Sequence, residues 1–135
     1  MIKKKILIAD EDPYILMMTK SRLEANGYEV LTTSKVSEAV KMANRSRPDL
    51  ILLDVILPTM EGRDACFELS SGETTRDIPI LVFTASSRKD VEAACLKAGA
   101  KAVITKPFDS SELLSLVKKA FDPNSKWRKS EDTDS

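Results

Sequence analysis

Acidic residues, a hydroxyl and a lysine follow four of the apolar runs in this chain, each at the point where a strand would end. Asp10 and Glu11 come directly after the first run, and Asp54 follows the third. Thr84 closes the fourth run, and Lys106 comes just after the fifth. If these runs are parallel strands of one sheet, their carboxyl ends meet at one edge. The spacing therefore predicts a compact site with three carboxylates, one hydroxyl and one ammonium group.

Three carboxylates in one place repel one another, and a folded domain tolerates them when a cation lies among them. Oxygen ligands without nearby histidine or cysteine indicate a hard ion, Mg²⁺ in preference to Ca²⁺. Magnesium commonly pairs one or two carboxylates with a phosphoryl oxygen. Lys106 and Thr84 would then contact further phosphoryl oxygens as a point charge and a hydrogen-bond donor. Asp54 is left as the nucleophile, which would form an acyl phosphate.

Taken singly, each of these residues also has a structural explanation. Acids are common in loops, threonine is common at strand ends, and Asp12 is explained by capping a helix. The coincidence of such residues at four strand ends is what favours a site over isolated structural roles.

Five short apolar runs are expected to form the strands that position these residues. None alternates cleanly between apolar and polar residues, and continuous runs are typical of strands buried on both faces of a parallel sheet. Helical patterns lie between and after them, the weakest of these at 62–69. This strand–helix order, repeated five times, predicts an α/β fold with helices on both faces of a parallel sheet. The runs are Ile6–Ala9, Val30–Thr32, Leu50–Leu53, Ile80–Phe83 and Ala102–Ile104.

The ends of the helical segments carry recognisable signals. Asp12 followed by Pro13 supplies an N-cap and a first-turn proline, and Gly27 marks the stop of that helix. Gly99 follows an apolar stripe of helical spacing as a C-cap, and Asp109–Glu112 resembles a capping box. These signals support the division into five helices.

Composition bounds the class of protein. The 135 residues suit one globular domain, and 21 basic residues balance 21 acidic ones, which gives no electrostatic case for binding nucleic acid or a membrane surface. The apolar runs are far shorter than the roughly 20 residues that span a bilayer, and no signal-peptide core is present, so we expect a cytoplasmic protein. The chain has no histidine. This excludes nucleophile pairs that use an imidazole base, and it excludes metal sites with imidazole ligands. Cys66 and Cys95 are expected to be free thiols.

From about Lys4 to Phe121 the chain resembles response-regulator receiver domains. The matching segments are ILIADEDP, PDLILLDVILPTMEG, IPILVFTA and AVITKPF. The resemblance implies a flavodoxin-like (βα)5 fold with strand order 2-1-3-4-5. It also implies that Asp54 is the phosphoacceptor, that Thr84 is the switch hydroxyl, and that Lys106 is the lysine typical of the family. Pro107 matches a proline that usually follows a cis peptide bond. Two further matches, Pro58 and Gly62, fall in the loop after the phosphoacceptor.

The resemblance also implies a set of magnesium ligands. Glu11 would bind the metal directly and Asp10 would act through water. Asp54 and the backbone carbonyl of Ile56 would complete the protein ligands. The acidic pair is Asp-Glu where Asp-Asp is commoner, and the longer Glu11 side chain should still coordinate.

At two positions, Val103 and Ile56, the residue type is expected to affect signalling and the lifetime of the acyl phosphate. Receivers usually carry Tyr or Phe three residues before the lysine, and this chain has Val103 there. The usual aromatic switch is therefore absent. The apolar side chain of Ile56 should leave attacking water without a polar partner, which predicts a long-lived acyl phosphate.

The function expected from these observations is that of a phosphoacceptor in two-component phosphorelay signalling. Residues 1–121 would form the receiver domain, and the polar tail 122–135, with Trp127, would be disordered or loosely docked, with no output domain in this chain. The expected partners are a sensor histidine kinase or a histidine phosphotransfer protein, and a downstream protein target. Three alternatives stay open: a binding module that has lost phosphorylation, a Mg²⁺ phosphatase with an Asp nucleophile, and a flavin carrier.

Overall fold

The computed structural model describes residues 3–55, 61–86 and 88–124. Strands and helices alternate along the chain, as the sequence predicts. The strands are β1 (Lys5–Ala9), β2 (Glu29–Thr33), β3 (Leu50–Val55), β4 (Ile80–Thr84) and β5 (Ala102–Thr105). The helices are α1 (Pro13–Ala25), α2 (Val36–Ser46), α3 (Glu61–Ser71), α4 (Lys89–Lys97) and α5 (Ser110–Phe121). The weakest helical pattern is therefore confirmed as α3.

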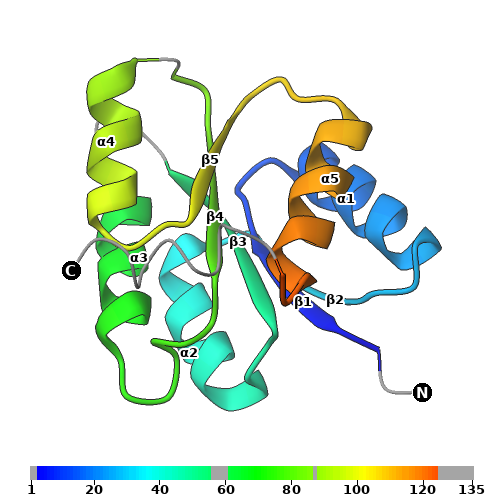
Figure 1. Ribbon diagram of the computed structural model, residues 1–135, viewed down its shortest axis with the longest axis horizontal. Coiled ribbons are helices and arrows are strands. Elements are labelled where there is room, and N and C mark those ends of the chain that lie inside the picture. Colours follow the sequence, from blue (N-terminus) through cyan, green and yellow to red (C-terminus); the bar gives the residue numbers. More distant parts are fainter. Residues whose placement is uncertain (1–2, 56–60, 87, 125–135) are drawn as a thin grey trace.

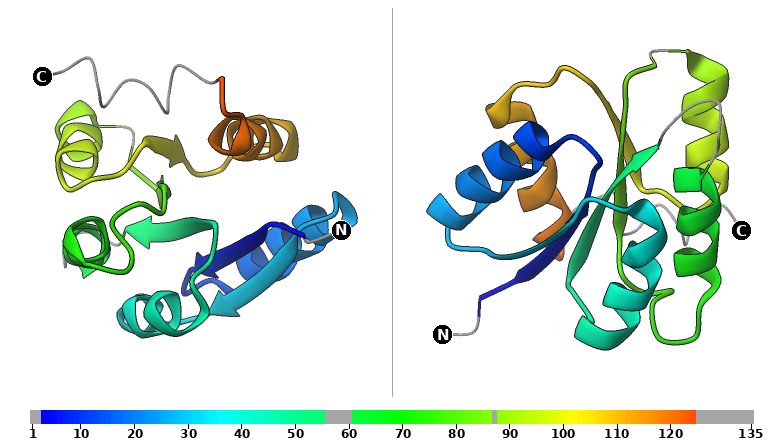
Figure 2. Two further views of the ribbon diagram at one scale, coloured as in Figure 1. Left: turned by 60° about the horizontal axis from the view of Figure 1, so that its bottom comes forward. Right: turned by 180° about the vertical axis from the view of Figure 1, so that it is seen from behind.

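The five strands form one parallel sheet in the order β2-β1-β3-β4-β5, which confirms the expected topology. Helices α1 and α5 cover one face of the sheet, and α2, α3 and α4 cover the other (Figures 1 and 2). The chain order reverses between β1 and β3, and in open parallel sheets ligands bind at this point, beyond the carboxyl ends of the strands.

The sheet is buried on both faces because its strands carry apolar residues at successive positions. In β1, Leu7 and Ala9 belong to the core under α2, α3 and α4, whereas Ile6 and Ile8 belong to the core under α1 and α5. Successive side chains of a strand point to opposite faces, so a continuous apolar run supplies both cores at once. This two-sided burial holds the strand ends, and the polar residues that follow them, in fixed positions.

Capping fixes where the helices beside the sheet edge begin. The Asp12 side chain accepts a hydrogen bond from Tyr14 N at the start of α1, and Asp109 accepts from Ser111 N and Glu112 N at the start of α5. Helix α1 nevertheless exposes large apolar side chains, since Tyr14, Met17 and Met18 are 60%, 62% and 44% exposed. These side chains lie outside the core and are open to a partner or ligand.

Neither Cys66 nor Cys95 is in a disulfide, as predicted, and both are buried in the core on the α3–α4 side. Burial raises the pKa of the Cys66 thiol to about 12, with a further contribution from Cys95. Of the predicted tail, only Asp122, Pro123 and Asn124 fall among the described residues, so Trp127 lies outside them. None of the helices in the described ranges is long and apolar enough to cross a bilayer.

Replacing Gly99 by alanine should lower the free energy of unfolding by about 3 kcal/mol, because backbone strain and overpacking add. Gly99 has a φ of +118°, and a Cβ there would collide with the Ser70 side chain of α3. Gly27 is the matched control: its φ is +90°, but no described atom lies within 4 Å of an added Cβ, so Gly27→Ala should cost about 1 kcal/mol. Urea unfolding of both variants tests this, and equal losses would contradict a tight α3–α4 contact.

Candidate functional site

The carboxyl ends of β1, β3, β4 and β5 bring four of the predicted residues to one edge of the sheet. Asp10 follows β1, and Lys106 follows β5. Thr84 is the last residue of β4, as expected. Asp54 lies inside β3, not after it, because the β3–β4 ladder continues through Asp54 to the pair Val55–Thr84. The shift does not remove Asp54 from the site, since it is the penultimate residue of the strand.

Lys106 joins the two buried carboxylates. Its Nζ lies 2.7 Å from Asp10 Oδ2 and 3.1 Å from Asp54 Oδ1. The Asp10 side chain is fully buried and that of Asp54 is 10% exposed, while the lysine side chain is 18% exposed. The backbone of Lys106 is fixed as well, because its N–H donates to the Thr84 carbonyl at 2.7 Å. The ammonium group is thus held between two carboxylates that would otherwise repel each other.

Burial and the nearby charges shift the pKa values of Asp54 and Lys106. Burial raises the pKa of Asp54, and the nearby Asp10 carboxylate raises it further, while Lys106 opposes both effects in part. Burial alone would lower the pKa of Lys106, but the hydrogen bond and charge of Asp10, together with Asp54, raise it overall. The lysine is therefore a firmly protonated cation, and the site carries more negative charge than one ammonium fully neutralises.

The two carboxylate oxygens of Asp10 have different partners. Oδ1 accepts a hydrogen bond from Asp12 N at 2.9 Å, which fixes the carboxylate plane. Oδ2 is buried and lies 2.7 Å from Lys106 Nζ, and among the described residues no donor other than this ammonium group contacts it. A buried carboxylate oxygen without a hydrogen bond is costly unless a cation is close. An additional hard cation beside Asp10 and Asp54 would fit this donor set, which consists of oxygens only.

Glu11 does not join this group in the structure, where its side chain is exposed. Among the described residues, no three acidic, cysteine or histidine side chains lie close enough together to hold a metal ion. Asp10 and Asp54 therefore converge where the sequence predicts three carboxylates, and Lys106 bridges these two. The expected ligand Ile56 and the loop residue Pro58 lie outside the described residues. The peptide bond between Lys106 and Pro107 is cis, as the resemblance implies.

Thr84 connects the site to the start of α4. Its side chain is buried, and its Oγ1 accepts a hydrogen bond from Ser86 N at 3.1 Å. The Ser86 hydroxyl in turn accepts from Arg88 N, the N-cap residue of α4, at 3.2 Å. Because the Ser86 amide uses an acceptor position of the Thr84 hydroxyl, the hydroxyl hydrogen is still available to donate. Ser86 therefore has a structural role that its sequence position alone did not indicate.

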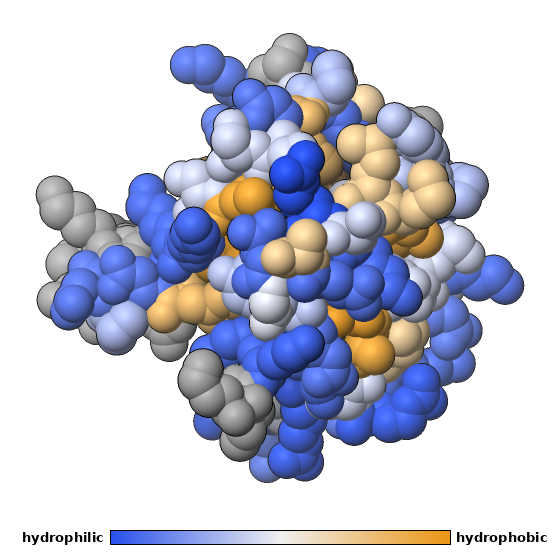
Figure 3. All heavy atoms as spheres, turned by 90° about the vertical axis from the view of Figure 1, so that its right-hand side faces the viewer, coloured by the Kyte–Doolittle hydropathy of each residue, from blue (hydrophilic) through white to orange (hydrophobic). Residues whose placement is uncertain are grey.

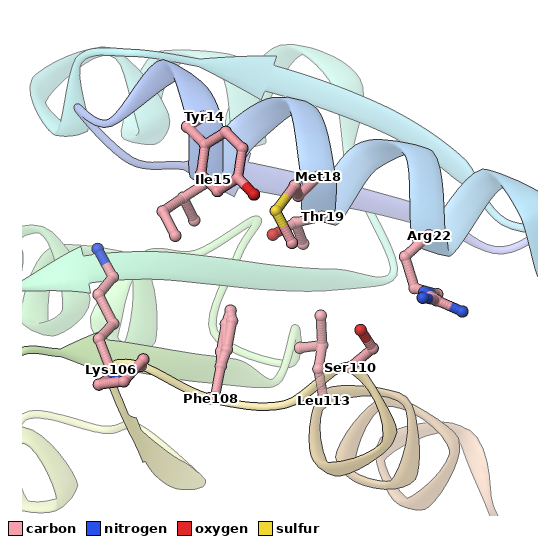
Figure 4. A pocket seen from close by; sticks show the side chains of 10 residues that line it. Tyr14, Ile15, Met18, Thr19, Arg22, Lys106, Phe108, Ser110 and Leu113 are labelled. Atoms are coloured by element: carbon pink, nitrogen blue, oxygen red, sulfur yellow. The ribbon is translucent and has the colours of Figure 1, made fainter.

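A groove next to Lys106 was not predicted from the sequence. It lies between α1 and the segment from Lys106 into α5, and its cavity volume is about 170 Å³ (Figure 4). Apolar side chains make up much of its wall, with Lys106 at one end and Arg22 at the other. Figure 3 views the molecule from the α1–α5 side and shows apolar patches between hydrophilic side chains. No periodicity in the sequence marks this groove, because its wall comes from separate segments.

Comparisons with known proteins give the family. The family model described as the response regulator receiver domain matches residues 6–118. The alkaline phosphatase synthesis transcriptional regulatory protein PhoP of Bacillus subtilis is 38% identical over 117 residues, which are 87% of this chain and 48% of that protein. The transcriptional regulatory protein PdtaR of Mycobacterium tuberculosis is 35% identical over 120 residues, 88% of this chain and 57% of that protein. The chain thus spans about half the length of the curated relatives it matches.

Solved structures agree with this match. The chemotaxis response regulator CheY4 of Vibrio cholerae has a TM-score of 0.81 at 28% identity, covering 88% of this chain and 99% of that one. The receiver domain of the sensor histidine kinase PA1611 from Pseudomonas aeruginosa PAO1 has a TM-score of 0.78 at 30% identity, covering 87% of this chain and 97% of that one. That structure has a magnesium ion coordinated in its active-site cleft.

Proposed function

Because the chain belongs to the response regulator receiver domain family, we propose that it accepts a phosphoryl group on Asp54 in two-component phosphorelay signalling. The observation that carries this proposal is the contact of Lys106 Nζ with both Asp54, at 3.1 Å, and Asp10, at 2.7 Å. This contact supports the proposal because two carboxylates and a fixed cation then lie together at the edge of the sheet where this fold binds ligands.

In the proposed reaction a carboxylate oxygen of Asp54 attacks the phosphorus of a phosphohistidine or a small phosphodonor. The bond from phosphorus to the donor breaks, and an acyl phosphate forms on Asp54. Lys106 neutralises one phosphoryl oxygen, and the Thr84 hydroxyl donates a hydrogen bond to another. The chain contributes position and charge, and it is a signalling protein that promotes its own modification, not a conventional enzyme.

Magnesium fits the carboxylates that this site contains. Asp10, Asp54, Glu11 and the backbone carbonyl of Ile56 are the groups that we propose hold it. The exposed Glu11 side chain would turn toward Asp10 to do so. When bound, the ion supplies positive charge that stabilises phosphoryl oxygens. A cation held there would also relieve the repulsion by Asp10 that, after burial, is the second cause of the raised pKa of Asp54.

The proposed partners are a sensor histidine kinase or a histidine phosphotransfer protein as donor, and a protein target that distinguishes the two states. The relatives named above include transcriptional regulators that are about twice as long as the matched region. Direct binding of nucleic acid by residues 1–121 is not part of the proposal, since this chain has no net charge.

Intact-protein mass spectrometry tests the proposed function. After incubation with Mg²⁺ and acetyl phosphate, the protein should gain the mass of one phosphoryl group, and the gain should disappear when EDTA replaces Mg²⁺. A protein that stays unmodified at millimolar acetyl phosphate, while a known receiver in the same buffer is modified, would favour the alternative of a binding module without phosphorylation.

Mg²⁺ should also stabilise the folded protein. A ligand that binds only the native state adds RT ln(1 + [L]/Kd), so a site of ~1 mM affinity in ~10 mM Mg²⁺ gives roughly 1.4 kcal/mol. Thermal melts with MgCl₂ and with NaCl of equal ionic strength measure this difference. Glu11→Gln should weaken the Mg²⁺ effect, whereas Glu73→Gln, at an exposed position between α3 and β4, should not. A midpoint that Mg²⁺ leaves unchanged would contradict a site formed in the native state.

A further inference from the structure

Two aromatic rings lie directly beside the residues proposed to hold the phosphoryl group. Phe83 and Phe108 have ring centroids 4.9 Å apart and an interplanar angle of 52°. Phe83 immediately precedes Thr84 in β4, and Phe108 is two residues beyond Lys106. The two groups assigned to phosphoryl oxygens are thus each within two residues of one ring of this pair.

The two rings differ in their freedom to move. Phe83 is fully buried in the core on the α1–α5 side. Phe108 is half-buried and also lines the groove of about 170 Å³ between α1 and α5, where its ring points toward Ile15 and Met18 (Figure 4). A cavity of about 150 Å³ is known to admit a benzene molecule, so the groove offers room for a phenyl ring. Phe108 therefore has a packed side, against Phe83, and an open side.

We propose that Phe108 reports the phosphorylation state of Asp54 to the groove between α1 and α5. This inference rests on the proposed function. Lys106 Nζ now divides its contacts between Asp10 and Asp54. A phosphoryl group on Asp54 adds negative charge and draws the ammonium toward itself. Pro107 has a φ fixed by its ring, so a displacement of Lys106 is passed along a stiff link to Phe108.

A movement of Thr84 would also reach Phe108, through the Phe83 ring on which Phe108 packs. When Thr84 turns toward the phosphoryl group, the end of β4 adjusts, and with it the Phe83 ring on which Phe108 packs. Val103 offers no ring for such a response: it is half-buried and packs against the core on the opposite face of the sheet. The groove beside Tyr14 and Met18, both exposed on α1, is then the surface whose shape depends on the state of Asp54.

Methionine methyl NMR provides a direct test, because an aromatic ring that moves changes the chemical shift of a neighbouring methyl group. Met18 lines the groove. Met17 is the neighbouring and more exposed residue of α1, and it does not line the groove. Met42 lies in α2 and packs on the opposite face of the sheet. Beryllofluoride with Mg²⁺ is the phosphoryl mimic, and ¹⁹F signals of bound fluoride report its binding separately. Binding should shift the Met18 signal more than those of Met17 and Met42.

Two variants decide whether Phe108 carries the change. Phe108→Leu should keep the bound ¹⁹F signal and lose the Met18 shift. Ile15→Phe keeps the Phe108 ring but fills the groove, and it should also reduce the shift. Val103→Ala should preserve it. Bound fluoride without a Met18 shift in the wild type, or a shift that survives both groove variants, would overturn the role of Phe108. Absence of bound fluoride would instead overturn the proposed function.

Discussion

Lys106→Ala should lower the free energy of unfolding by about 3 kcal/mol at neutral pH in the absence of divalent metal. Removing one partner of a buried ion pair costs roughly 3–5 kcal/mol. The low end of this range applies because the lysine side chain is 18% exposed. The substitution leaves Asp10 and Asp54 facing each other without a cation. Lys118→Ala, at an exposed position of α5, is the control and should change stability by less than about 0.5 kcal/mol.

The stability lost in Lys106→Ala should become smaller at low pH and in the presence of Mg²⁺. Burial and Asp10 raise the pKa of Asp54, so the native state holds this proton more tightly than the unfolded state does. Below the ordinary carboxyl pKa of about 4, Asp54 is protonated in the native state, so Asp10 and Asp54 do not repel each other. The repulsion develops as the pH rises through the raised pKa of Asp54. The difference between wild type and Lys106→Ala should shrink on acidification and also on addition of Mg²⁺. A difference independent of both would show that Lys106 stabilises by packing alone.

Thr84→Ala should abolish the backbone response to beryllofluoride while leaving the fold intact. Hydrogen exchange in the wild type should change mainly at residues 84–90, because a chain of hydrogen bonds joins Thr84 Oγ1 to Ser86 and then to Arg88 at the start of α4. If the hydroxyl turns toward the phosphoryl group, this loop must follow. Without the hydroxyl, neither the phosphoryl contact nor the contact with Ser86 exists.

Val103→Ala is the matched comparison for that experiment. A valine is stiff at χ1 and has little surface to move, so we expect the response at 84–90 to persist in this variant. The response should also be modest, since a signal is no larger than the difference in contacts between two states. If Val103→Ala removes the response as completely as Thr84→Ala does, β5 carries the change and the hydrogen-bond chain through Ser86 does not.

The fold could be predicted from the sequence because the apolar runs and the helix-capping residues indicate the same strands and helices. Continuous apolar runs are typical of strands with two buried faces. Asp12, Pro13 and Asp109 mark helix starts that the structure confirms. The end of β3 is predicted at Leu53, two residues early. Ladder pairing extends it through Asp54 to Val55, and no side-chain pattern indicates where a ladder stops. The order of strands came from family resemblance, since the local sequence does not encode which strands pair.

The site could be predicted only as a set of residues at one edge. Asp10, Asp54, Thr84 and Lys106 converge there because parallel strands end together. Their pairing could not be predicted, since it depends on rotamers: Lys106 bridges the two carboxylates, whereas Glu11 is exposed. The groove beside Phe108 was also missed. Its wall combines α1 with the segment after β5, and contacts between segments about 90 residues apart leave no trace in local periodicity.

The identity of the phosphorylated residue is the most direct test of the central claim. After incubation with acetyl phosphate and Mg²⁺, borohydride reduction converts an aspartyl phosphate to homoserine, which peptide mass spectrometry locates. We expect homoserine at position 54 alone and no phosphoryl adduct on intact Asp54→Asn. Asp64→Asn, at an exposed position of α3, should be modified as fully as the wild type. A phosphoryl adduct that persists in Asp54→Asn, or homoserine at another aspartate of the wild type, would contradict phosphorylation at Asp54.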